Sequence, residues 1–194
     1  MKFVFLGEEG VGKTSLLMAY SKGCVPKVYV PTVFDSYSLN VSAGNVPYKL
    51  SLFDTSGQDK YGKLRPLSYP NTDIFLICFS IVSPESFHKI KDKFVPEVKK
   101  HCPKARIFIV GTQVDLRNDL DTVEKLAKNR LRPVAEAEGE QLAHELGAIG
   151  YFECSALTKV AVTELFKAAI ASAIEKDDEQ VENVQSARCA CTIS

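Results

Sequence analysis

The stretch Gly7–Ser15, "GEEGVGKTS", constrains the fold more than any other part of the chain. It fits the pattern G-x-x-x-x-G-K-[ST], in which backbone N–H groups of a glycine-rich loop surround phosphates at the N-terminus of a helix. Such a loop needs a strand before it and a helix after it. The apolar run Lys2–Leu6 and the amphipathic segment Lys13–Lys22 supply both.

Further apolar runs alternate with helix-like segments along the chain, and this alternation predicts the fold class. Strands are expected at Lys2–Leu6, Tyr37–Val41, Tyr48–Phe53, Ile74–Ser80, Arg106–Gly111 and Tyr151–Cys154, and helices at Lys13–Lys22, Glu85–His101, Ala135–Leu146 and Val162–Glu175. The second and third strands are joined by a short loop and indicate an antiparallel hairpin. We therefore predict an α/β fold: a six-stranded, mostly parallel sheet with one antiparallel edge strand and helices on both faces.

The chain predicts one domain followed by a tail. Its 194 residues suffice for one well-buried core and are too few to favour two. The domain is expected over residues 1–176, whereas residues 177–194 are polar without periodicity and indicate a flexible tail. Within the domain, the charged segment Leu120–Arg132 predicts a short exposed helix, for which a solvated insertion is favoured over a specific binding role.

Charge and cysteine usage narrow the class further. Lys plus Arg and Asp plus Glu each number 24, so no overall charge favours nucleic acid, and we predict no nucleic-acid partner. Four of the six cysteines are scattered without metal-ligand spacing, which favours reduced thiols in the cytoplasm over a secreted disulfide framework. We expect no signal peptide, and no membrane-spanning helix, because the sequence lacks the apolar run of roughly 20 residues that such a helix needs.

The glycine-rich loop predicts a site for a phosphate chain and a metal ion. Lys13 is expected to reach the β- and γ-phosphates, and Thr14 to offer its hydroxyl to Mg²⁺. The loop residues expected to contact the bound group are Glu9, Gly10, Val11, Gly12, Lys13, Thr14 and Ser15.

Two further segments complete this predicted site. In "DTSGQ", at the end of an apolar strand, Asp54 is placed to bind Mg²⁺ through water, Gly57 to give its amide to the γ-phosphate, and Gln58 to orient the attacking water. In "VPTVFDSY", Thr32 can complete the Mg²⁺ shell when the γ-phosphate is present, which makes Val30–Tyr37 a switch. The predicted metal ligands are thus Thr14, Thr32 and Asp54, and the predicted catalytic residues Gln58, Lys13 and Thr32.

Two other strand ends predict recognition of a base. Asp115, in "GTQVD", can accept hydrogen bonds from both N1–H and the 2-amino group of guanine. Adenine lacks this donor pair and would leave a buried carboxylate unpaired, a loss large enough to discriminate. In "ECSAL", the backbone N–H of Ala156 is placed for the guanine O6.

These elements, in this order and spacing, resemble a small GTPase over essentially the whole chain. "YVPTVFDSY", "LRPLSYP" and the insertion after "DLRND" narrow the resemblance to the Rho family, near Rac. The resemblance implies the P-loop GTPase fold with a Rho-type insert helix at about 120–132. It adds nucleotide contacts at Val25, Tyr29, Thr112, Gln113, Leu116, Ser155 and Leu157. It places effector contacts at Phe34, Asp35 and Tyr37, and a second switch at Tyr61, Leu64 and Leu67.

The same resemblance implies a monomer that cycles between GTP and GDP with Mg²⁺. Its expected partners are effectors, exchange factors, GTPase-activating proteins and a dissociation inhibitor. A P-loop ATPase or kinase is the alternative, and Asp115 argues against it.

Three departures from the family pattern each favour the GTP-bound state. Glu9 stands where a glycine is expected, against the γ-phosphate, the glutamine and an incoming arginine finger. Ser56 replaces an alanine near the γ-phosphate, and Val25 replaces a phenylalanine that packs on the guanine. Gln113, in place of a lysine, is tolerated in close relatives. Together they predict slow hydrolysis and fast exchange, a switch biased towards its GTP state. Two alternatives stay open: a GTP-bound interaction module with negligible turnover, and ordinary cycling with Glu9 facing solvent.

The last four residues, "CTIS", form a C-a-a-X box that predicts prenylation of Cys191. One lipid anchors only marginally, and the usual polybasic run is missing, so Cys189 is the candidate for palmitoylation as a second signal. The expected location is the cytoplasm, with the lipid-bearing form on the cytoplasmic face of the plasma membrane.

Overall fold

The computed structural model describes residues 1–26, 28, 30–44 and 46–175. Within them, six strands form one sheet in the order β2-β3-β1-β4-β5-β6. The strands are β1 (Lys2–Leu6), β2 (Phe34–Ala43), β3 (Val46–Thr55), β4 (Ile74–Ser80), β5 (Arg106–Thr112) and β6 (Gly150–Cys154). Edge strand β2 pairs antiparallel with β3, and the other neighbours pair parallel. The predicted α/β fold is confirmed.

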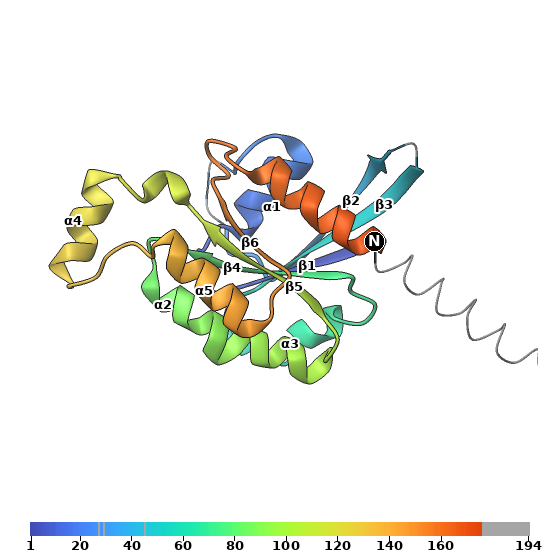
Figure 1. Ribbon diagram of the computed structural model, residues 1–194, viewed down its shortest axis with the longest axis horizontal. Helices are drawn as coiled ribbons and strands as arrows, with labels where there is room; N and C mark the ends of the chain where they lie inside the picture. The colour runs from blue at the N-terminus through green and yellow to red at the C-terminus, as the bar shows by residue number, and fades with distance from the viewer. Residues whose placement is uncertain (27, 29, 45, 176–194) are drawn as a thin grey trace, which may run out of the picture.

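The helices cover both faces of the sheet (Figure 1). Helix α1 (Lys13–Lys22) and a last helix over residues 162–175 lie on one face, and their side chains share a core with Phe3, Phe5 and Leu76. The other face carries α2 (Pro84–Lys89), α3 (Val95–His101) and α5 (Glu136–Leu146), which share a core with Phe75 and Ile77. Every residue of β4 is buried, as expected for a central parallel strand.

Two predicted elements differ from those observed. The hairpin is longer than predicted, because the β2–β3 ladder runs from Phe34↔Thr55 to Ala43↔Val46 and includes polar residues that favour no strand by themselves. The single helix expected over Glu85–His101 is interrupted by a π-helical turn, Ile90–Phe94. Pro96 lacks an N–H and its ring clashes with the carbonyl four residues earlier, so the α-helical pattern cannot continue through this point.

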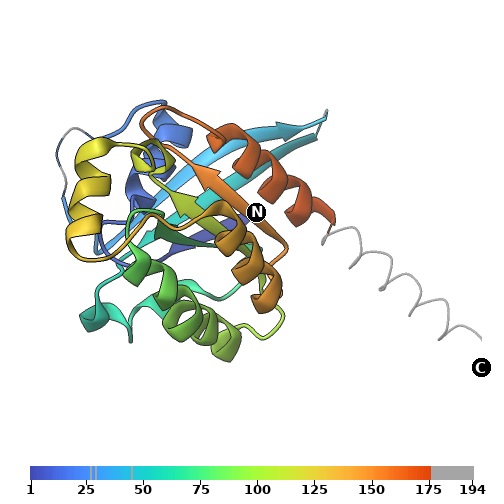
Figure 2. The ribbon, with the colours of Figure 1, turned by 60° about the vertical axis from the view of Figure 1, so that its left-hand side comes forward.

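The charged segment after β5 forms helix α4 (Leu120–Lys128), which lies at the edge of the molecule in two views (Figure 1, Figure 2). None of its side chains, all of which are described, is buried. Asp119 caps its start by accepting a hydrogen bond from the Thr122 N–H at 3.0 Å. The helix ends before the predicted Arg132, where Arg130 takes a left-handed φ of 58°. Among the described helices, none is long and apolar enough to cross a membrane.

Candidate functional site

Two adjoining cavities lie at the carboxyl ends of the strands, with volumes of about 520 and 290 Å³. Gly12, Ser15 and Gln113 line both. The larger is also lined by predicted residues Glu9, Gly10, Lys13, Thr14, Thr32 and Gly57, and the smaller by Val25, Thr112, Asp115, Leu116, Ala156 and Leu157. The structure thus places the phosphate-type residues around one cavity and the base-type residues around its neighbour.

Parallel pairing brings these loops together. The β1–β3 register sets Phe5 beside Asp54, so the phosphate loop (Gly7–Ser15) and the segment Asp54–Gln58 leave the sheet side by side. A Cβ on Gly57 would lie 2.3 Å from the carbonyl carbon of Glu8, so only glycine permits this close approach. Gly12 has a φ of 93°, a conformation that glycine adopts without strain.

Lys13 lies at the floor of the phosphate cradle, and its side chain is buried. Its Nζ donates to the carbonyl oxygens of Gly7, at 2.9 Å, and Glu8, at 2.7 Å. Burial lowers the pKa of this ammonium group, although the Asp54 carboxylate opposes the shift. A buried cation that is held by uncharged carbonyls beside a glycine-rich loop is suited to binding a phosphate anion.

The predicted metal ligands form one connected group. The Thr14 hydroxyl donates to Oδ2 of Asp54 at 2.5 Å and lies 2.9 Å from the Thr32 hydroxyl. Within the described part of the chain, Oδ1 of Asp54 is buried and has no hydrogen-bond partner, and burial raises the pKa of this carboxyl group. Two hydroxyls and a carboxylate with an unsatisfied oxygen form a hard donor set that fits Mg²⁺, directly or through water.

A bidentate ion pair joins the two loops around the smaller cavity. Arg117 follows the "GTQVD" strand end and donates to both carboxylate oxygens of Glu153, at 2.5 and 2.6 Å, at the start of "ECSAL". It also donates to the carbonyl of Val134 at 3.0 Å. The two loops that contribute Asp115 and Ala156 to the smaller cavity are therefore joined to each other by an ion pair.

Some predicted residues lie away from the cavity surfaces. The side chain of Val11 is buried in the core, and that of Ser155 is buried and accepts a hydrogen bond from the Thr158 N–H at 3.0 Å. Tyr29, Cys189 and Cys191 lie outside the described residues.

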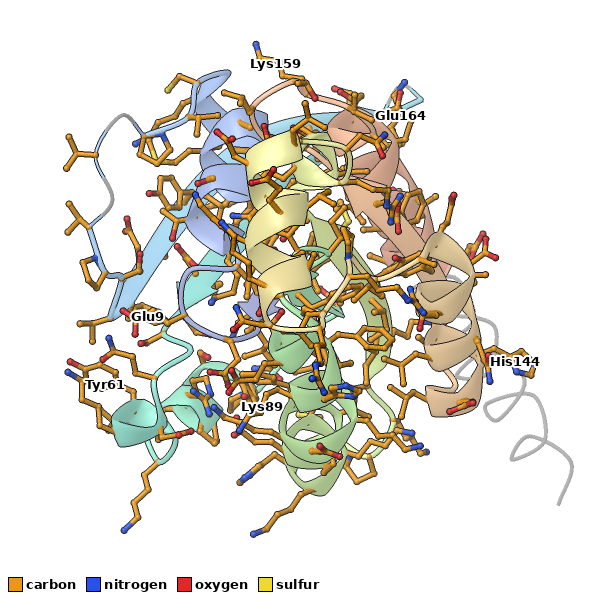
Figure 3. The ribbon with its side chains drawn as sticks, turned by 90° about the vertical axis from the view of Figure 1, so that its left-hand side faces the viewer. Glu9, Tyr61, Lys89, His144, Lys159 and Glu164 are labelled. Atoms are coloured by element: carbon orange, nitrogen blue, oxygen red, sulfur yellow. The ribbon has the colours of Figure 1, made fainter. Side chains whose placement is uncertain are left out.

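Gln58 points to Glu9. Its Nε2 donates to Oε1 of Glu9 at 2.7 Å. This hydrogen bond joins the side chain predicted to orient the water to the glutamate that stands where the family pattern has a glycine. Glu9 lines the larger cavity, and Figure 3 shows it at the same end of the molecule as Tyr61. Glu9 is exposed, as the ordinary-cycling alternative expects, and it also engages the predicted catalytic residue.

Ser56 makes a local contact. Its hydroxyl is buried and accepts a hydrogen bond from the backbone N–H of Gln58 at 3.3 Å. The serine thus acts on the Gln58 backbone, in addition to lining the larger cavity as expected for a residue near the γ-phosphate.

Arg65 and Glu97 hold the start of the second switch (Gly57–Leu67), and no role was predicted for either residue. Arg65 donates to the Ser56 carbonyl at 2.9 Å and to the two carboxylate oxygens of Glu97 at 3.1 and 2.9 Å. Burial alone raises the pKa of Glu97, but hydrogen bonds from Arg65 and Tyr69 outweigh it, and the pKa is lowered overall. "LRPLSYP" contains Arg65, but its partner is separated by 32 residues and has no distinguishing motif.

Replacing Glu97 with glutamine is expected to lower the free energy of unfolding by about 3 kcal/mol at pH 7, because it leaves the Arg65 guanidinium buried without a counterion. Glu97 has a lowered pKa in the folded chain. The ion pair therefore stabilises above the unfolded glutamate pKa of about 4.3, and this is lost as pH falls through the folded pKa. Urea unfolding at saturating GDP should show the difference between the two proteins narrowing below that pH. A difference that is independent of pH would contradict the assignment.

A third cavity, of about 370 Å³, lies between the two predicted switches. Its walls include Phe34 and Phe53 from the β2–β3 hairpin and Leu64 and Leu67 from the second switch. Phe34, Leu64 and Leu67 are 52, 55 and 76% exposed. Such an exposed apolar surface is typical of a protein interaction site.

Comparison with protein families identifies a match over most of the chain. The family model described as the Ras family matches residues 2–175, which span both nucleotide-type cavities and the whole described sheet.

Proposed function

Because the chain belongs to the Ras family of small GTPases, we propose that it is a Rho-type GTP/GDP switch whose GTP state persists. Small GTPases of this family bind GTP and GDP with Mg²⁺ and hydrolyse GTP. The observation that carries the narrower proposal is the 2.7 Å hydrogen bond from Gln58 to Glu9.

The cavity residues suggest how GTP is held. The phosphate loop supplies backbone N–H groups, and Lys13 supplies a cation to the β- and γ-phosphates. Thr14, Thr32 and Asp54 would hold Mg²⁺, which neutralises phosphate charge when bound. Asp115 accepts two hydrogen bonds from guanine, and Ala156 donates its N–H to the O6.

Hydrolysis requires more of Gln58 than binding does. To orient a water molecule, its carboxamide must accept from the water and keep its donors free for the phosphate oxygens. In this chain Nε2 donates to Glu9. The Glu9 carboxylate also brings negative charge towards the γ-phosphate, and its side chain occupies space that an arginine finger needs. We therefore propose slow intrinsic hydrolysis and resistance to activating proteins.

Single-turnover hydrolysis of bound GTP, with and without a Rho-type activating protein, tests this proposal. A second candidate is an interaction module with negligible turnover, which the same contact favours. The two differ in the residual rate: measurable multiple turnover supports the slow switch, and its absence supports the module.

Val25 carries the proposal of fast nucleotide exchange. It lines the smaller cavity, where the resemblance implies an aromatic ring against the guanine. Replacing Val25 with phenylalanine is expected to slow GDP release about tenfold, because an aromatic pair contributes about 0.5–1.5 kcal/mol beyond area burial. Release of a fluorescent GDP analogue measures this. An unchanged rate would mean that residue 25 does not contact the base.

The Rho-type assignment also concerns surfaces and the tail. We propose that effectors and exchange factors bind at the third cavity, between the switches, and that the exposed helix α4 is a Rho-type insert helix. We propose a dissociation inhibitor and a prenyl group on Cys191 as further Rho features, with Cys189 as the second lipid site. Mass spectrometry of the membrane-bound protein tests the lipids, and an unmodified Cys189 would refute the second one.

A further inference from the structure

Lys93 contacts both halves of the phosphate site without belonging to any motif. Its ammonium group lies 2.6 Å from Oε1 of Glu8, 2.7 Å from Oδ1 of Asp59 and 3.2 Å from the carbonyl oxygen of Gly57. An ammonium group has three donors, so these acceptors can satisfy all of them. Its side chain is 19% exposed, which limits competition from water.

Lys93 comes from the π-helical turn Ile90–Phe94, between α2 and α3. Such turns are rare and are found frequently at functional sites. Glu8 belongs to the phosphate loop, whereas Gly57 and Asp59 belong to the second switch. Lys93, which belongs to neither segment, thus joins the two segments that surround the predicted γ-phosphate position.

The contact with the Gly57 carbonyl constrains a peptide plane. In a trans peptide the carbonyl and the following N–H point in opposite directions, so fixing the Gly57 oxygen also fixes the Gln58 N–H. That N–H donates to the side-chain hydroxyl of Ser56. The preceding peptide is fixed in the same way by Arg65, which holds the Ser56 carbonyl. The Gly57 N–H, predicted to meet the γ-phosphate, lies between these two held carbonyls.

Charge adds to this geometry. Three carboxylates belong to the phosphate loop and the second switch: Glu8 and Asp59 pair with Lys93, and Glu9 lines the larger cavity. The Asp59 side chain is 88% exposed, so that pair alone contributes little. The Glu8 side chain is 29% exposed, and its pair with Lys93 is less screened by water.

We propose that Lys93 is a positioning residue that couples the phosphate loop to the second switch and sets the preference of the site for GTP over GDP. This inference rests on the proposed function, because it assigns a role at the γ-phosphate position. Without the ammonium group, the carboxylates repel the additional phosphate of GTP, and the Gly57–Gln58 peptide keeps only the hydrogen bond from the Gln58 N–H to the Ser56 hydroxyl. GDP does not reach this part of the cradle and is affected less.

The test is Lys93→Met, which keeps the apolar stem and removes the charge. Dissociation of fluorescent GDP and of a non-hydrolysable GTP analogue is measured by stopped flow. We expect the GTP analogue to leave about tenfold faster and GDP to change by less than about twofold. Lys91→Met is the matched control, because Lys91 is 61% exposed and pairs with Glu145 at 3.6 Å, away from the site. It should leave both rates unchanged.

Equal acceleration of both nucleotides, or no change in either, would overturn the proposal, since a purely structural lysine does not alter the ratio of the two rates. If Lys93→Met does not fold, Glu8→Gln serves instead. It removes a carboxylate and keeps the ammonium group, so the ratio should shift in the opposite direction, with the GTP analogue leaving more slowly relative to GDP, and an unchanged ratio would equally overturn the proposal. The failure of the proposed function can be told apart from the failure of the role of Lys93. If the unmodified chain binds neither nucleotide, the proposed function is refuted. If the variants leave the ratio of the two dissociation rates unaltered, only the role of Lys93 is refuted.

Discussion

Replacing Glu9 with glycine is expected to raise hydrolysis stimulated by an activating protein by about 10³-fold or more. An arginine finger supplied in trans accounts for about 10³–10⁵ in rate in GTPases of this type, so its readmission dominates the change. The substitution also frees Nε2 of Gln58 from its 2.7 Å hydrogen bond to Glu9 and removes a carboxylate from the larger cavity. Single-turnover hydrolysis at saturating activating protein measures the effect.

Glu9→Gln separates charge from size. It keeps a side chain of the same length but removes the negative charge, and its own carboxamide can still bind Gln58. If crowding of the finger dominates, this variant stays within about tenfold of the unmodified chain, because the finger's contribution of about 10³ or more stays excluded. If Glu9→Gln is as fast as Glu9→Gly, charge is the cause. If Glu9→Gly is as slow as the unmodified chain, Glu9 is not the obstacle.

Replacing Asp115 with asparagine is expected to weaken GDP binding by about 10³-fold or more, because a site built for two donors loses one acceptor and gains a competing donor. Xanthine presents a carbonyl where guanine presents the 2-amino group. Asparagine can accept from its N1–H and donate to that carbonyl, so xanthosine diphosphate should bind the variant better than GDP. Competition between the two diphosphates for the site measures the preference.

Asp119→Asn is the matched control for this experiment. Asp119 lies four positions further along the chain and caps α4 through the Thr122 N–H at 3.0 Å, outside both cavities. It should keep the preference for GDP. An Asp115→Asn protein that still prefers GDP would show that the base does not bind at the smaller cavity.

The fold was predictable where one sequence segment carries its own signal. The boundaries of β1, β4 and α1 match those observed, because continuous apolar runs and the glycine-rich loop define them locally. The length of β2 and the π-helical turn were not predicted. The first depends on ladder pairing with β3, and the second depends on how the chain accommodates Pro96 within a packed helix.

The candidate site was likewise predictable only where a local motif marks its residues. Most of the predicted residues line the two cavities because glycine spacing and strand ends determine their positions, whereas Val11 and Ser155 are buried away from them. The contacts of Lys93, and the pairing of Arg65 with Glu97, join residues 32 to 85 positions apart. Single lysines and glutamates in a charged sequence carry no sign of such pairing. The sequence identified Glu9 as anomalous, but its hydrogen bond to Gln58 depends on the packing of Gly57 against the phosphate loop.

If Glu9 uncouples GTP binding from hydrolysis, an activating protein should barely accelerate hydrolysis by the unmodified chain. The chain is loaded with GTP, and phosphate release in a single turnover is followed with and without a saturating Rho-type activating protein. We expect tight GTP binding and acceleration below about tenfold, against the roughly 10³–10⁵ that an arginine finger contributes. Acceleration within that range would contradict this expectation.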